Sequence, residues 1–149
     1  DKGEIVEALI EQCVGDLLEV LSRTVGEPQS LPDALAGLVN GHVEFFLDHR
    51  EKYLLLFQGR LLKPDPAVTV SIARPYEDYL HGVEEFLGPF LPPPAEALKA
   101  RRLTCAVAGF VWGFLSFAIV ALKPETIRES MKPLRDAFLD GAVKFIELS

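Results

Sequence analysis

The stretch LTCAVAGFVWGFLSFAIVAL, from Leu103 to Leu122, decides the fold, because no charged residue stands between Arg102 and Lys123. A helix that is apolar on every side is either the buried centre of a bundle or a membrane span, and this one is long enough to span. Gly109 and Gly113 also form the GxxxG pattern that membrane helices use for close packing. The other predicted helices are amphipathic and need an apolar partner. We therefore predict a buried central helix and keep a membrane-associated protein using 103–122 as the alternative.

Apolar residues recur every three or four positions on both sides of this stretch, which is typical of amphipathic helices. Ser30 is a suitable N-cap for the second helix, and Gly37 falls on its polar side. Pro75 should kink its helix or begin a new one, and Pro133 should interrupt or bend the last helix. No alternating strand pattern is visible, so we predict one all-α domain over 1–149, a helical bundle with a central apolar helix. The predicted helices cover 3–23, 31–48, 51–62, 68–90, 95–122 and 125–147.

Composition narrows the class of protein. The 149 residues are 49% apolar and carry a net charge of −7, which excludes disorder and argues against a surface that binds nucleic-acid phosphates. Cys13 and Cys105 form no CxxC pair, so reduced thiols are expected rather than a disulfide or zinc scaffold. The acidic amphipathic start does not resemble a secretion signal, and the only methionine is Met131. We expect a cytoplasmic protein with a further segment upstream.

Catalytic patterns are missing from the sequence. There is no GxSxG, no glycine-rich phosphate loop, no HExxH and no pair of ExxH motifs. Asp78 and His81 are three residues apart and could share a metal, but a solvated acid beside an ordinary histidine is the simpler interpretation. The sequence predicts that the protein is not an enzyme and has no cofactor or metal. A small helical-bundle enzyme or metal carrier remains an alternative.

Aromatic residues point to a ligand cavity beside the central helix. His42 lies on an apolar helix face, where an ionisable ring needs a partner or a wet cavity, and it is placed at the cavity edge. Ordinary core packing and a core-edge histidine are the alternatives. Arg60, Arg74 and Arg101 could meet an acidic head group at the mouth. The remaining predicted lining residues are aromatic or aliphatic: Phe45, Phe46, Phe57, Tyr76, Tyr79, Leu80, Val83, Phe110, Phe114 and Phe117.

Small residues on the central helix predict close contact with another helix. The last helix is apolar around more than one side, so both helices have more apolar surface than one neighbour covers. We predict a homodimer built by helices 95–122 and 133–147, two from each subunit, as a four-helix bundle. The predicted interface residues are Ala106, Gly109, Gly113, Ser116, Leu134, Phe138, Gly141 and Phe145.

The order of these segments resembles a known family. An opening DKGEIVEAL leads the first helix, FFLDHREKYLLLF ends the second, the apolar helix follows Arg101 and Arg102, and the chain closes on PLRDAFLDGAVKFI. This is similar to the ligand-binding and dimerisation region of TetR-type transcriptional regulators, from which Pro75 and Pro133 depart. The resemblance implies a repressor that releases operator DNA when an apolar or amphipathic small molecule binds. Operator DNA would be contacted only by an N-terminal helix-turn-helix module that is not in this sequence.

Overall fold

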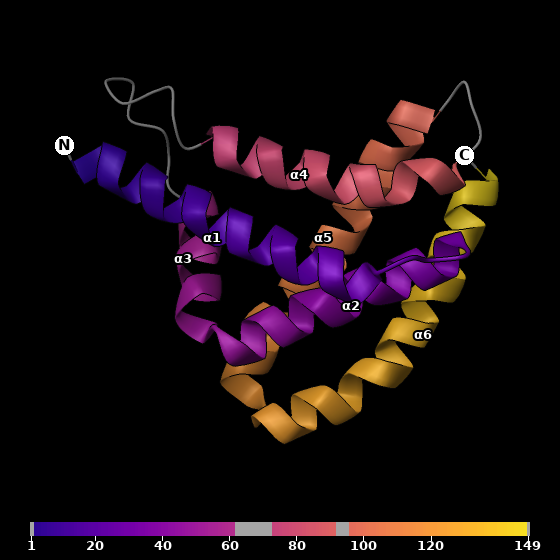
Figure 1. The fold of residues 1–149 in the computed structure, drawn as a ribbon. Coiled ribbons are helices and arrows are strands. Elements are labelled where there is room, and N and C mark those ends of the chain that lie inside the picture. Colours follow the sequence, from indigo (N-terminus) through magenta and orange to yellow (C-terminus); the bar gives the residue numbers. More distant parts are fainter. Residues whose placement is uncertain (1, 62–72, 92–95, 149) are drawn as a thin grey trace.

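The computed structural model describes residues 2–61, 73–91 and 96–148, which are helical apart from short connections (Figure 1). Within them no strand forms, which confirms the all-α class. The helices are α1 (Lys2–Val25), α2 (Leu31–Asp48), α3 (Arg50–Leu61), α4 (Ala73–Leu87), the 3₁₀ turn η1 (Gly88–Phe90), α5 (Glu96–Ala121) and α6 (Pro124–Leu148).

Pro75 and Pro133 both lie inside described helices. Pro75 lies in the first described turn of α4, and the helix continues from it to Leu87. The predicted start of this helix, residues 68–72, falls outside the described residues. Pro133 lies inside α6, and the helix continues past it and curves along its length (Figure 1), so of the two predicted outcomes the interruption does not occur and the bend agrees with the structure. A single missing hydrogen bond is therefore tolerated in α6 without ending the helix.

The connection between α1 and α2 follows local capping rules. Gly26 has a φ of 59°, the left-handed conformation that ends helices and that glycine adopts without strain. Ser30 is the N-cap of α2, as predicted, and its Oγ accepts a hydrogen bond from the Asp33 backbone N–H at 3.2 Å. The short link turns the chain back, so that α2 packs against the last turns of α1.

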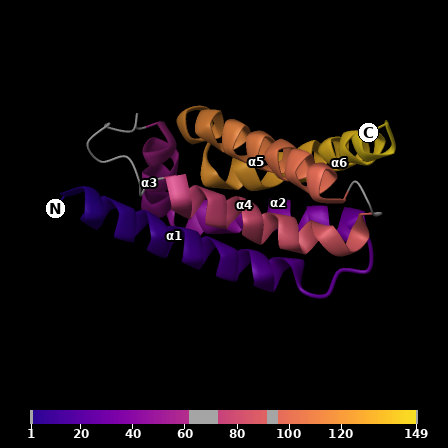
Figure 2. The same ribbon diagram turned by 90° about the horizontal axis from the view of Figure 1, so that it is seen from above.

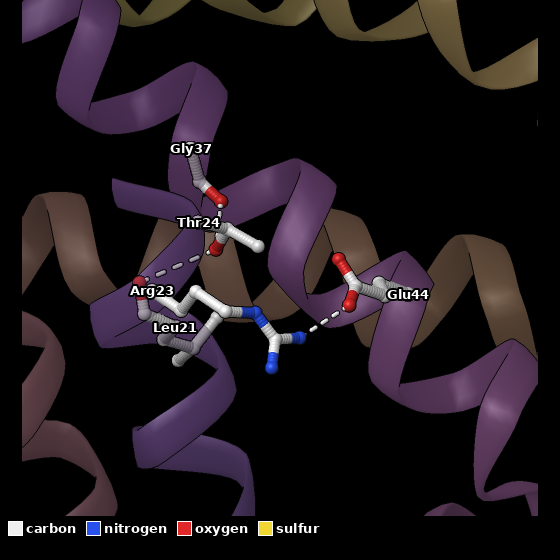
Figure 3. A network of polar contacts seen from close by, with 5 residues as sticks. All are labelled: Leu21, Arg23, Thr24, Gly37 and Glu44. Carbon is white, nitrogen blue, oxygen red and sulfur yellow. Dashed lines mark hydrogen bonds and ion pairs between the residues drawn. The ribbon is translucent and has the colours of Figure 1, made fainter. Parts of the chain in front are cut away.

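Glycines allow α1 and α2 to approach closely where they cross (Figure 3). A Cβ atom added at Gly37 would lie 2.7 Å from the Val25 Cα and 2.9 Å from the Thr24 carbonyl oxygen. The Thr24 hydroxyl donates across the crossing to the Gly37 carbonyl at 2.9 Å, and an Arg23–Glu44 ion pair lies beside it. The placement of Gly37 on a solvated face was therefore wrong, because the residue is buried against α1.

The helices form three levels (Figure 2). α5 and α6 lie side by side at one level and α1 lies at the opposite level. Between them lie α2 and α4, which contact both α1 and α5. The most apolar part of α5 is 39% buried, so the residues that the structure describes cover one side of this helix and leave the other exposed. Ala97–Ala121 is long and apolar enough to cross a membrane by length and composition, which is weak evidence by itself.

We predict opposite effects of two glycine-to-alanine substitutions. Gly37→Ala should lower the free energy of unfolding by about 1–3 kcal/mol, because its methyl group meets backbone atoms that cannot rotate away. Gly15→Ala is the matched control: its Cβ meets nothing within 4 Å, so it should stabilise the helix by about 0.5–1 kcal/mol. Urea unfolding monitored by circular dichroism measures both. Equal changes in the free energy of unfolding for the two substitutions would contradict the close contact of α1 and α2 at Gly37.

Candidate functional site

An apolar pocket of about 330 Å³ lies between α4 and α5. On α4 the lining residues are spaced i, i+3 and i+4, and on α5 they are spaced i, i+3, i+4 and i+7, so each helix contributes one stripe. Ala108 and Gly109 on α5 have small or no side chains and leave open space, which the rings of Tyr76, Tyr79 and Trp112 border. The seven described lining residues are Tyr76, Tyr79, Leu80, Cys105, Ala108, Gly109 and Trp112.

A directed chain of hydrogen bonds fixes the back wall of this pocket. The Leu38 carbonyl can only accept, so the Nδ1 of buried His42, 2.7 Å away, carries the proton. The Nε2 of the same ring is then an acceptor and receives the Tyr79 hydroxyl proton at 2.7 Å. The Tyr79 oxygen in turn accepts from the Trp112 indole N–H at 3.2 Å. α2, α4 and α5 are thereby tied together, and two pocket residues have fixed orientations.

Burial determines the protonation of His42. The ring is buried and no acidic partner contributes to its titration, so desolvation lowers its pKa from 6.5 to about 4, although the hydrogen bond to the Leu38 carbonyl acts in the opposite direction. A neutral ring is also what the hydrogen-bond chain requires, because Nε2 must accept from Tyr79. His42 is therefore a buried histidine with hydrogen-bond partners on both ring nitrogens, which was the alternative interpretation of the sequence. It does not line the pocket itself but contacts Tyr79, which does.

The other phenols near the pocket are also engaged. Tyr76 donates to the Leu56 carbonyl of α3 at 2.5 Å, and Tyr53 donates to the Trp112 carbonyl of α5 at 3.0 Å. The Tyr53 and Trp112 rings lie 5.7 Å apart, in the range of favourable aromatic contact. These bonds hold the aromatic walls in place before any ligand arrives.

The structure separates the predicted ligand residues into three groups. Tyr76, Tyr79 and Leu80 line the pocket. The core holds another group, His42, Phe45, Phe46 and Val83, while Phe57 is partly buried against Tyr53. The aromatic row of α5 points elsewhere: Phe110 stacks on Phe138 of α6 at 4.5 Å, and Phe114 and Phe117 line a groove on the outer side.

Four lining residues were missed by the sequence reasoning. Cys105, Ala108, Gly109 and Trp112 form a continuous stripe on α5 at helical spacing. Of these four residues only Gly109 had a predicted role, which was contact with another helix at the dimer interface. The spacing of Trp112 from the two small residues one turn earlier was the signal that could have identified this wall.

An exposed apolar groove lies along the second half of α5. It has a volume of about 380 Å³, and its described lining residues are Gly113, Phe114, Phe117, Ala118, Ala121 and Leu122. Phe117 is 80% exposed and Val120 87% exposed, and Leu134 and Phe145 of α6 are exposed as well. Of the predicted interface residues, Ala106, Gly109, Gly113 and Gly141 are exposed, Ser116 is half-buried, and Phe138 is half-buried against Phe110.

A third hollow, between α2 and α6, is charged and differs in character from the pocket. It measures about 420 Å³ and contains Glu44 and Asp48 on the α2 side and Arg128, Lys132 and Arg135 on the α6 side. Arg135 donates across it to the Asn40 side-chain oxygen at 2.9 Å. Among the described residues no group of three His, Cys, Asp or Glu side chains could hold a metal ion.

Comparison with known proteins gives no relative. A scan against protein-family models and searches of curated proteins and of solved structures found no match.

We predict an acid-dependent loss of stability that His42 causes. Between pH 6.5 and 4 the unfolded chain binds a proton that the folded chain does not, so the free energy of unfolding falls as the pH falls through this range. The shift corresponds to about 3 kcal/mol. A His42→Gln variant can still accept from Tyr79 but does not titrate. Chemical unfolding measures the free energy of unfolding of both proteins. The difference between wild type and variant should become smaller by about 3 kcal/mol from pH 7 to pH 4. A difference that does not change with pH would contradict the neutral, buried state of His42.

Proposed function

We propose that this chain is the effector-binding and dimerisation domain of a TetR-type transcriptional repressor that releases DNA when an apolar or amphipathic small molecule binds. The observation that carries the proposal is that α5 has two separate apolar features. One is the half-open pocket towards α4, and the other is the exposed apolar groove at Phe117. A ligand site and a subunit interface on one helix are what such a regulator needs.

The pocket supports the ligand-binding part of the proposal. Its volume of about 330 Å³ lies at the lower end of the range found for small-molecule sites, and its walls are mainly aromatic and aliphatic. The polar groups behind it are already bonded to one another, as expected of a largely preformed site. The protein would act by binding, not by catalysis, and no cofactor is required.

The exposed apolar face supports the homodimer. Large apolar patches on soluble proteins mark interaction surfaces, and Phe117 and Val120 are almost fully exposed in the single chain. A Cβ at Gly113 or Gly141 meets nothing within 4 Å, so a second copy could approach the backbone closely at both positions. We expect α5 and α6 of two subunits to bury roughly 2,000 Å² in total.

Regulation would follow from linkage between the two features. A ligand shifts the protein between two arrangements only by the difference in its affinity for them. The pocket wall connects through Tyr79 and His42 to α2, which packs closely against α1 at Gly37. α1 would transmit the shift to a DNA-binding module of the same cytoplasmic protein. Operator DNA would be bound by that module alone, since this chain carries a net charge of −7.

We predict that the domain is a dimer at micromolar concentration. Sedimentation should give twice the chain mass of 16.5 kDa. Phe117→Glu should weaken the dimer by roughly 100-fold or more, because two-fold symmetry buries the new carboxylate twice. Ile5→Glu, on the exposed side of α1, is the matched control and should leave it unchanged.

The same experiment separates the alternatives. A stable monomer for the wild type would overturn the dimerisation part of the proposal. Wild-type protein that stays in solution only with detergent would favour a membrane-associated protein that uses the same face of α5.

A further inference from the structure

The hydrogen-bonding groups of the α4–α5 pocket are committed to the protein itself. The Tyr79 proton is used by His42, the Tyr76 proton by the Leu56 carbonyl, and the Trp112 N–H by Tyr79. The remaining described lining side chains are aliphatic, apart from the weakly polar thiol of Cys105. A carboxylate placed in this pocket would lose its hydration and find no free strong donor among the described lining residues.

Charges near the pocket are also compensated. Arg101 lies one turn before Cys105 on α5, and its guanidinium is paired with Glu84 and, at 3.3 Å, with Glu77. Arg74, near the start of α4, is paired with Glu11 at 3.2 Å and lies 4.0 Å from Asp78. Two of the three arginines considered for an acidic head group are thus already matched by carboxylates. The third, Arg60, falls outside the described side chains.

A cationic ligand would also find no counter-charge inside the pocket. Glu77 and Glu84 both pair with the Arg101 guanidinium, and neither is among the described lining residues. The aromatic faces of the pocket could attract a cation, but this attraction is small compared with the loss of hydration on entering an apolar site. Both signs of charge are therefore disfavoured by the same arrangement.

From these observations we infer that the α4–α5 pocket is selective for uncharged, hydrocarbon-rich molecules and rejects the anionic and cationic derivatives of the same skeleton. This inference rests on the proposed function, because it takes the pocket as the effector site. It narrows the effector from an apolar or amphipathic molecule to one without an ionised group.

Two natural reporters make the pocket testable without labels. Trp112 is the only tryptophan and lines the pocket, so its fluorescence reports occupancy. Cys105 is exposed and lines the same pocket, whereas Cys13 is buried and serves as the internal control for thiol alkylation. Suitable probes are 1-adamantanol, adamantane-1-carboxylate and adamantane-1-ammonium at pH 7, which share one skeleton and do not absorb where tryptophan does.

The neutral alcohol should slow the alkylation of Cys105 and change the Trp112 fluorescence at a concentration at least tenfold lower than either charged probe. Ala108→Leu, which places a larger side chain in the pocket, should weaken this effect at least tenfold. Ala8→Leu on the exposed side of α1 should not change it. Thermal unfolding of both variants verifies that they are folded.

Each other outcome has a definite meaning. If the carboxylate or the ammonium probe protects Cys105 as well as the alcohol does, the inference about charge is wrong and the effector pocket stands. If no probe protects Cys105 up to millimolar concentration, the pocket is not an effector site, and the ligand-binding part of the proposed function fails with it. A monomeric protein in sedimentation would leave the charge selectivity intact.

Discussion

The structure depends on one constraint, which is that α5 is apolar on every side from Leu103 onward, while the described residues cover only part of it. α2, α4 and α6 pack on α5, and they bury residues such as Leu103, Val107 and Leu115 completely or nearly so. Because exposed apolar surface is unfavourable in water, we propose that each exposed side of α5 meets a partner from outside the chain. The pocket towards α4 and the groove at Phe117 are the two places where such partners would bind.

The buried polar groups give this arrangement its precision. Apolar packing alone tolerates small shifts between helices, whereas the bonds from Trp112 to Tyr79 and from Tyr79 to His42 fix three helices at once. All three hydrogen bonds of this network form only when His42 is neutral, and the burial of the ring favours the neutral form. Any ligand that displaces Tyr79 would therefore also disturb α2, and α2 is held against α1 by the close contact at Gly37.

Much of the fold follows from the sequence, but less of the site does. Hydrophobic periodicity and capping at Ser30 predict the helices to within a few residues, because both are local. The role of Gly37 is not local: it looked polar by position, and only the approach of α1 explains it. The same limit applies to the pocket, since periodicity identified the Tyr79 face of α4 but could not show that Trp112, rather than Phe110 or Phe114, completes it.

The central claim is that the open face of α5 meets a second copy of the chain, and cross-linking tests it most directly. Phe117→Cys, in a Cys105→Ser background that removes the other exposed thiol, should form a covalent dimer rapidly under mild oxidation at micromolar concentration. Ile5→Cys in the same background should cross-link slowly, because α1 lies at the opposite level of the molecule (Figure 2). Equal, slow and concentration-dependent rates for the two variants would contradict the account.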